Sequence, residues 1–265
     1  MDFELYLNFI NLVSHLYILI SQDMVTKEGI VLGSVPRPYV HTHNILHRGI
    51  GMIVSKDVDI IHAIGKSGDD NETPEVYVHQ RTATKRIFPS LYDMFVGGVS
   101  SSGEDSQLTA AREVAEELGL TRALDILEDK DHLLTTKASN PLSDMLFQCT
   151  ICTSYNRCVV SMFTYTCDTS IESITWQEEE VQWGDFIDYD IIETAAALSI
   201  DRLVKKNAWP GRYESGSSSA NNDLSKEESQ FFGEWANWDF VPDGLLVWEA
   251  WVAFISEKRN RSHEE

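Results

Sequence analysis

The chain has 265 residues, of which 43% are hydrophobic and 24% are charged, so it is long enough for one sizeable globular domain of ordinary composition. Its 42 acidic residues outnumber its 21 basic ones and give a formal net charge of −21. A surface this acidic repels nucleic-acid backbones and anionic membranes. We therefore expect no nucleic-acid partner.

The N-terminus is apolar without being a clear membrane span. Leu5–Ile20 is apolar except for Asn8, Asn11 and His15, which recur at helical spacing and would form a narrow polar stripe. The segment is shorter than the roughly 20 residues that cross a bilayer, and acidic rather than basic residues precede it. We expect an amphipathic helix packed on the protein or on a partner. The alternative is a membrane-surface anchor through residues 5–20.

The chain from residue 24 to residue 98 has mainly strand patterns. Met24–Arg37 has the pattern of a strand, a turn and a second strand. Gly49–Val54 and Glu75–Arg81 are strand candidates, and a loop rich in Gly, Asp and Asn separates them at Lys66–Thr73. Tyr92–Gly98 is predicted to be a short apolar strand.

Helix patterns appear in the remainder of the chain. The predicted helices are Gln107–Leu118, which ends at Gly119, then Ile191–Lys206, and Gly244–Ile255, which would bury Leu246, Trp248 and Trp251. The predicted strands are a hairpin of Met145–Thr153 and Val159–Cys167, followed by Val181–Phe186.

Strands and helices that interleave around a hairpin predict an α/β fold with a mixed sheet. We expect residues 1–22 to form the N-terminal extension and residues 23–265 a single domain. The Ser- and Asn-rich stretch 213–228 is expected to be a disordered insertion.

The cysteines indicate a reducing compartment. All four fall within one short stretch and no secretory signal precedes them, which favours a cytoplasmic location over a disulfide scaffold. Cys149 and Cys152 have the spacing of a zinc motif. They lie on a predicted strand, however, where alternation directs them to opposite faces, so zinc is not expected.

Three carboxylates fall on the predicted helix Gln107–Leu118. Glu113, Glu116 and Glu117 stand at positions i, i+3 and i+4 and therefore share one face. Such a face can simply be solvated. A hard divalent cation would instead offset the repulsion, and it would bridge an acidic site to an anionic substrate.

Residues at fixed spacing surround this cluster. They resemble the Nudix box: a Gly, five residues, Glu, seven residues, Arg-Glu, an aliphatic residue, any residue, Glu-Glu, any residue, Gly and an aliphatic residue. Every defined position is filled, by Gly98, Glu104, Arg112, Glu113, Val114, Glu116, Glu117, Gly119 and Leu120. The resemblance implies an α/β/α sandwich with a loop–helix–loop metal site for Mg²⁺ or Mn²⁺. It also implies hydrolysis of a nucleoside diphosphate linked to another moiety, which would make the protein a pyrophosphohydrolase.

The flanks are similar to a Nudix subgroup close to isopentenyl-diphosphate isomerase. The similar residues are His41, His47-Arg48-Gly49, Gln80-Arg81-Thr82, Lys85, Phe88-Pro89 and Asp93. The catalytic cysteine of the isomerase would fall on Gly97 and a metal-binding histidine on Val99, and its later Glu-x-Glu pair is not found. Hydrolysis is therefore favoured. An isomerase-like enzyme and a non-catalytic nucleotide-diphosphate sensor are the alternatives.

The resemblance also suggests roles for the box residues. Glu113 and Glu117 are the first choices for metal ligands, followed by Glu116 and the carbonyl of Gly98. Glu104 would orient a ligand or a bound water. Arg112 would pair with a box carboxylate and fix its rotamer, or be purely structural.

Roles outside the box are less specific. Arg81 and Lys85 are candidates to contact substrate phosphates, although basic residues beside a strand are common on surfaces. The general base would be a box glutamate or one of the three glutamates before Val181, namely Glu178, Glu179 and Glu180. His41, His43 and His47 are interpreted as structural loop histidines because no matching third metal ligand accompanies them.

Overall fold

The computed structural model describes residues 21–64, 73–128, 140–210 and 233–262. The predicted N-terminal helix, almost all of the predicted loop at 66–73 and the predicted insertion at 213–228 lie outside these residues. In the described part of the chain, no helix is long and apolar enough to cross a membrane.

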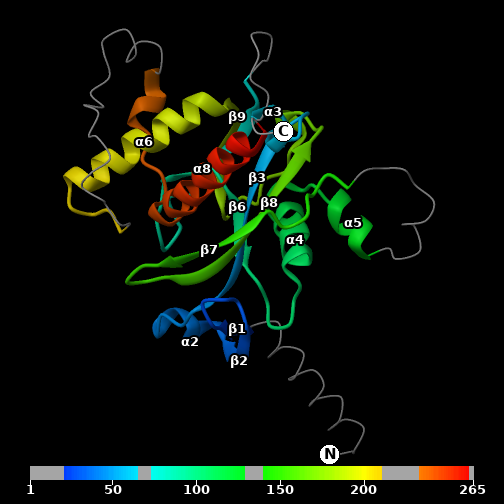
Figure 1. The fold of residues 1–265 in the computed structure, drawn as a ribbon, viewed down its shortest axis with the longest axis vertical. Helices are drawn as coiled ribbons and strands as arrows, with labels where there is room; N and C mark the ends of the chain where they lie inside the picture. The colour runs from blue at the N-terminus through cyan, green and yellow to red at the C-terminus, as the bar shows by residue number, and fades with distance from the viewer. Residues whose placement is uncertain (1–20, 65–72, 129–139, 211–232, 263–265) are drawn as a thin grey trace, which may run out of the picture.

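The described strands form one mixed, nine-stranded sheet (Figure 1). They are β1 (Ser21–Val25), β2 (Val31–Pro36), β3 (His47–Lys56), β4 (Glu75–Arg81), β5 (Tyr92–Asp93), β6 (Val96–Val99), β7 (Phe147–Cys152), β8 (Arg157–Cys167) and β9 (Val181–Asp188). β3 is central, because it pairs in parallel with β8 along its whole length and antiparallel with β6. β4 pairs antiparallel with β9 and with β5, whereas β1 and β2 form a hairpin at one end.

Helices cover both faces of this sheet. They are α2 (Arg37–Thr42), α3 (Ile60–Ile64), α4 (Ser106–Leu118), α5 (Arg122–Glu128), α6 (Tyr189–Lys205) and α8 (Pro242–Ser262), with short 3-10 turns η2 (Ile171–Ser173) and η3 (Gly233–Asn237). Figure 1 shows α6 and α8 on one side of the sheet and α4 and α5 on the other. The expected α/β/α sandwich with a mixed sheet is confirmed.

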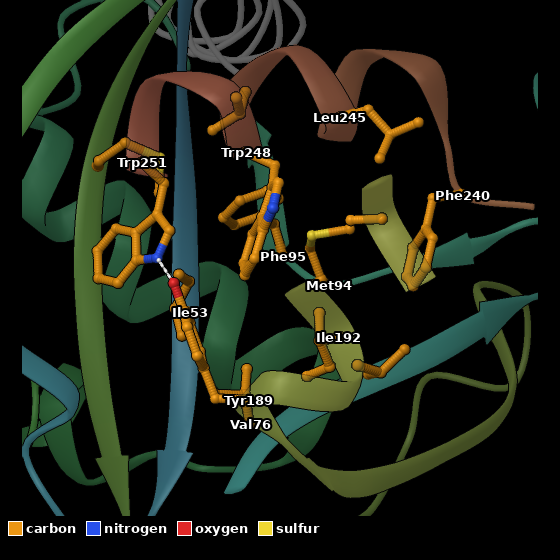
Figure 2. Close-up of a cluster of buried hydrophobic side chains, with 14 of the residues drawn as sticks. Ile53, Val76, Met94, Phe95, Tyr189, Ile192, Phe240, Leu245, Trp248 and Trp251 are labelled. Carbon is orange, nitrogen blue, oxygen red and sulfur yellow. Dashed lines mark hydrogen bonds between the residues drawn. The ribbon is translucent and has the colours of Figure 1, made fainter. Parts of the chain in front are cut away.

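The larger core lies between the sheet and the pair α6 and α8. Figure 2 shows its aromatic centre, where the fully buried Trp251 donates a hydrogen bond from Nε1 to the hydroxyl of Tyr189 at 3.0 Å. Because the indole N–H has a partner, Trp251 is buried without an orphaned donor. Trp248 is buried as predicted, but Leu245 fills the core position where Leu246 was expected, and Leu246 is only partly buried.

The second core lies under α4 and α5. Ala110, Ala111, Val114 and Leu118 form the apolar face of α4 and are at most 1% exposed. They pack against β3 and β6. This packing fixes the rotation of α4, and it therefore decides which way the glutamates on its other positions point.

One predicted strand is wrong as a single element. Tyr92–Gly98 is broken at Met94-Phe95 into β5 and β6 because the chain changes partner there, from β4 to β3. The other strands and helices predicted within the described residues are confirmed, with ends shifted by a few residues and with α8 extending to Ser262. The short helices α2, α3 and α5 were not predicted.

Candidate active site

Local capping fixes both ends of α4. At its start, the side chain of Asp105 accepts a hydrogen bond from the backbone N–H of Gln107 at 2.9 Å. At its end, Gly119 adopts the left-handed conformation with φ 69° and donates its N–H to the carbonyl of Ala115 at 3.0 Å. The capped helix thus holds its glutamates in a fixed position relative to β6.

A buried ion pair ties the loop before α4 to the sheet. Asp23 of β1 pairs with Arg48 of β3, and it also accepts hydrogen bonds from the Ser102 hydroxyl at 2.7 Å and the Gly103 N–H at 3.1 Å. Arg48 in turn donates to the Glu104 carbonyl at 2.9 Å. Burial tends to raise the pKa of Asp23, but these three partners outweigh it and hold the pKa below its usual value. The loop is therefore anchored by charge and not only by its own turns.

Arg112 connects three carboxylates. Its Nε and Nη2 donate to the two oxygens of Glu104 at 2.9 and 3.2 Å, while Nη1 lies 2.9 Å from Glu113 and 3.1 Å from Glu116. Glu104 also accepts the N–H of Ser101 at 3.0 Å. The predicted pairing of Arg112 with box carboxylates is thus present. Glu104 is occupied by these contacts, which fits an orienting residue better than a metal ligand.

The three glutamates of α4 differ sharply in burial, although they share one face. Glu117 is buried, the side chain of Glu113 is 13% exposed, and that of Glu116 is 52% exposed. Within the described residues, the Glu117 carboxylate has no hydrogen-bond or ion-pair partner. A buried carboxylate left without a partner is costly, so its environment needs an explanation.

The charges around Glu117 show that its carboxylate lacks a positively charged partner within the described part of the chain. Its pKa lies well above the usual value, first because it is buried and then because of the negative charges of Glu113, Glu180 and Asp93; Arg81 acts in the opposite direction. Burial also raises the pKa of Glu113. Carboxylates that are buried close together repel one another when ionised. A bound cation, or protons on some of them, would offset this repulsion.

Gly98 on β6 lies against the Glu113 carboxylate. A β-carbon at this position would stand 2.5 Å from Oε2 of Glu113 and closer still to its Cδ and Oε1. Only a glycine leaves room for the carboxylate beside the strand at this point. The predicted set of Gly98, Glu113 and Glu117 is therefore brought together on one side of the helix.

These groups line a cleft of about 680 Å³. Arg81 and Lys85, the two predicted phosphate contacts, line the same cleft. Lys85 forms an ion pair with Glu180, whereas Arg81 donates to the carbonyl of Ile87 at 3.2 Å and keeps a buried Nε without a hydrogen-bond partner in the described structure. The cleft therefore contains the acidic helix face and two cationic side chains.

The structure distinguishes the three glutamates before Val181. Glu180 lines the cleft and acts electrostatically on Glu117. Glu178 and Glu179 are exposed and do not line it. Of the three predicted general bases, only Glu180 is in a position to reach a substrate in this cleft.

Two cleft residues were not among the predicted site residues. Asp93 is half-buried next to the start of α8, and the loss of solvent there raises its pKa to about 6. Burial lowers the pKa of His79 to about 3, and its Nδ1 has no partner in the described structure. Asp93 interrupts an apolar stretch in the sequence, and this was the signal that could have identified it.

The predicted loop histidines have separate roles. His43 contacts the Tyr39 carbonyl through Nδ1 at 3.1 Å and stacks on the Tyr39 ring. His41 and His47 both line the cleft, with ring centroids 5.7 Å apart. All four cysteines are free, and Cys149 is partly buried while Cys152 is exposed.

The described residues contain no group of three or more His, Cys, Asp or Glu side chains placed to hold a metal ion by themselves. The donors that line the cleft on α4 are the carboxylates of Glu113, Glu116 and Glu117, and Gly98 lies beside the first of them. Mg²⁺ is commonly held by just such a set, with water and substrate phosphates completing its shell. The unpartnered Glu117 and the glycine beside Glu113 therefore fit a hard divalent cation.

Comparison with known proteins gives the family. The NUDIX domain model matches residues 62–208. A Nudix hydrolase of Streptomyces coelicolor is 36% identical over 226 residues, which cover 85% of this chain and 84% of that protein. A Nudix hydrolase of Rhodococcus erythropolis is 36% identical over 94 residues, which span 36% of this chain and 43% of the relative. The crystal structure of DR0079 from Deinococcus radiodurans aligns at 16% identity and a TM-score of 0.44, over 66% of this chain and 89% of that one.

The narrower likeness to the isomerase subgroup stays a prediction. The family itself follows from the match over more than half of the chain and from the S. coelicolor relative. Enzymes of this family cleave pyrophosphate linkages and generally require a divalent metal. The chain belongs to the Nudix hydrolase family.

Proposed function

We propose that this protein is a Mg²⁺- or Mn²⁺-dependent pyrophosphohydrolase that cleaves the diphosphate linkage of a small nucleoside-diphosphate-type or related compound. The observation that carries the proposal is the buried, unpartnered Glu117 beside Glu113 and Gly98 in a cleft that also holds Arg81 and Lys85. Acidic and cationic groups in one cleft suit a substrate that is itself anionic and binds through a cation.

Glu113, Glu117 and the carbonyl of Gly98 would hold the cation, with Glu116 at the exposed edge. When bound, the cation lowers the pKa of a coordinated water and neutralises the charge that develops on phosphorus. Arg112 keeps Glu113 and Glu116 in position through its 2.9 and 3.1 Å contacts. This makes Arg112 a positioning residue in the proposed mechanism.

Arg81 and Lys85 would hold the phosphate groups. Arg81 is suited to this because its buried Nε–H has no partner in the described structure, and a planar guanidinium can bind two phosphate oxygens at once. Lys85 would exchange part of its contact with Glu180 for the substrate. That exchange would free the Glu180 carboxylate next to the reaction site.

Glu180 would then accept the proton of the attacking water. It is the one member of the predicted triplet in the cleft, and the loop that carries it is fixed by hydrogen bonds from Thr82 to the carbonyls of Glu179 at 3.0 Å and Glu180 at 3.0 Å. Glu178→Gln is a matched control because Glu178 is exposed and lies outside the cleft. We expect Glu180→Gln to lower kcat about 100-fold or more, as for loss of a general base, and Glu178→Gln to leave it unchanged. Equal kcat values for the two variants would remove Glu180 from the mechanism.

The function is tested by incubating the purified protein with Mg²⁺ or Mn²⁺ and a panel of nucleoside and isoprenoid diphosphate compounds, and following phosphate and monophosphate release. We expect release that stops with EDTA and falls at least about 100-fold in Glu117→Gln, since a metal centre supplies several kcal/mol of transition-state stabilisation. Glu128→Gln, an exposed change outside the cleft, is the control. Tight binding without turnover would favour the sensor, and isomerised product would favour the isomerase.

Glu117→Gln should also fold. The substitution removes a buried charge without changing the size of the side chain, so the metal-free variant should unfold at the same temperature as the wild type or higher. A loss of activity in this variant is therefore not explained by misfolding.

A further inference from the structure

The cleft extends beyond the diphosphate site to a second, cationic end. Arg37 and His41 of α2 and His47 at the start of β3 line this end. Arg86 follows Lys85 in the loop after β4; it is exposed and does not itself line the cleft, but it stands between Lys85 and Ile87, which do, and its charge acts on the His41 ring, so it belongs to the rim of this end. None of these four residues has a part in the proposed hydrolysis.

The two histidines are held in place. His47 is 2% exposed, and its Nδ1 is 2.9 Å from the carbonyl oxygen of Ile45. Because a carbonyl oxygen can only accept, Nδ1 carries a hydrogen. Burial lowers the pKa of His47 and favours the neutral ring, so Nε2 is left as an acceptor, which can bind the hydroxyl of a singly protonated phosphate. The ring of His41 meets that of His47 edge-on. This wall of the cleft is thus built from ordered polar side chains.

Among the described residues, no acidic side chain neutralises the positive charge at this end. In a chain of net charge −21, Arg37 and Arg86 have no ion-pair partner among the described residues. Burial, together with the charges of Arg37 and Arg86, keeps the pKa of His41 below its usual value. Asp243 also lines the cleft, but both its oxygens are occupied, by Tyr155 at 2.6 Å and Asn156 at 2.7 Å. Cations gathered without anionic partners in an otherwise acidic protein indicate a site for an anionic group.

We propose that Arg37, His41, His47 and Arg86 form a second anion subsite, which binds a phosphate monoester carried by the substrate in addition to its diphosphate. The substrate class is therefore a diphosphate compound with a further phosphate group on one of its two moieties. A phosphate monoester carries about −1.5 to −2 charges at neutral pH, and two arginines with two histidines match it better than they match a carboxylate.

The spacing along the sheet separates this subsite from the diphosphate site. Gly98 pairs with Ile50 of β3, and His47 lies three residues earlier on the same strand. At about 3.3 Å per residue, the second subsite is about 10 Å from Gly98. A diphosphate group alone is too short to reach both ends, so the second phosphate must sit on the attached moiety.

The inference rests on the proposed function for its choice of ligand, so binding is measured separately from turnover. Two pairs of diphosphate compounds that differ by one phosphate monoester serve as probes: coenzyme A against dephospho-coenzyme A, and NADPH against NADH. Their affinities for the full-length protein are measured by calorimetry in EDTA, where no hydrolysis occurs. Within each pair, the preference in binding is the ratio of the two affinities. The preference in turnover is the ratio of the two kcat/KM values, measured with Mg²⁺.

The wild type should prefer the phosphorylated member of at least one pair. In the double variant Arg37→Gln/Arg86→Gln this preference should fall about fivefold for each cation removed, as for partly exposed ion pairs. Raising the salt concentration should also weaken it. Arg122→Gln on α5, outside the cleft, is the matched control and should keep the wild-type preference.

Three results would overturn the second subsite: no preference for the phosphorylated member of either pair, whether in affinity or in kcat/KM with Mg²⁺; a preference that survives in the double variant; or a preference that is equally lost in Arg122→Gln. Preferential binding in EDTA without any turnover in Mg²⁺ would support the subsite and refute the hydrolase proposal. The two proposals can therefore fail independently.

Discussion

Gly98→Ala isolates the geometry of the proposed metal site. The added β-carbon would stand 2.5 Å from Oε2 of Glu113 and nearer to its Cδ, so the carboxylate must move away from β6. The three atoms nearest to the added β-carbon all belong to the end of this flexible side chain, and the backbone of Gly98 is not in the left-handed region. The substitution therefore displaces one ligand and leaves the fold in place.

The expected cost is mainly catalytic. Misplacing a reacting or ligating group by about 1 Å can lower the rate about 100-fold, which is the loss in kcat/KM that we expect for Gly98→Ala. Glu113 also loses its 2.9 Å contact with Arg112, but such a partly exposed pair contributes only about 1 kcal/mol or less to stability. The assay is a Mn²⁺ titration of activity combined with a thermal melt. Wild-type activity and Mn²⁺ dependence in Gly98→Ala would refute the assignment of Glu113 as a ligand.

Two other glycines provide controls. Gly33→Ala on β2 should change neither activity nor stability, since a β-carbon there meets nothing within 4 Å. Gly97→Ala places its β-carbon 2.7 Å from the carbonyl oxygen of Ile50, which belongs to the backbone and cannot rotate away. We expect it to lower the free energy of unfolding by about 1–3 kcal/mol. Adjacent glycines should thus give different phenotypes.

Two further predictions concern the surroundings of the site. Asp23→Ala should lower the free energy of unfolding by about 3 kcal/mol in urea denaturation, because it leaves Arg48 partly buried and unpaired, and an unchanged denaturation midpoint would contradict this. His79 has a pKa of about 3 in the folded protein, so below pH 6.5 the unfolded chain takes up a proton that the folded state does not. This residue should therefore cost about 1.4 kcal/mol of stability for each pH unit between 6.5 and 3. The raised pKa of Asp93 contributes in the opposite direction, and comparing wild type with His79→Gln cancels that contribution. Parallel profiles of stability against pH for the two proteins would refute the assignment.

Much of the fold could be predicted from local patterns. Alternating and helical spacing located most strands and helices, and Gly119 marked the end of α4 correctly. The break between β5 and β6 could not be predicted, because it arises where the chain leaves β4 to pair with β3. Which of Leu245 and Leu246 enters the core depends on how α8 is rotated against the sheet, and neighbouring apolar residues do not reveal that.

In the candidate site, too, local spacing predicted some features and tertiary packing decided the others. Spacing placed Glu113, Glu116 and Glu117 on one face, but their different burial follows from the packing of α4 on β3 and β6. The sequence gives no reason to choose Glu180 over Glu178. The choice comes from the loop path after η2, which turns one of the two side chains into the cleft. Asp93 lies against Gly244 at the start of α8, which is about 150 residues later in the sequence. A local sequence pattern cannot predict a contact between residues so far apart.

Hydrolysis in ¹⁸O-labelled water, followed by mass spectrometry of the products, tests the central claim most directly. With Mg²⁺ or Mn²⁺ we expect one ¹⁸O atom in a phosphate-containing product of each turnover, because water attacks phosphorus. We expect no labelled product in EDTA and at least about 100-fold less in Glu117→Gln. Label in phosphate that persists in EDTA, or turnover that leaves every phosphate unlabelled, would contradict a metal-dependent pyrophosphohydrolase built on Glu113 and Glu117.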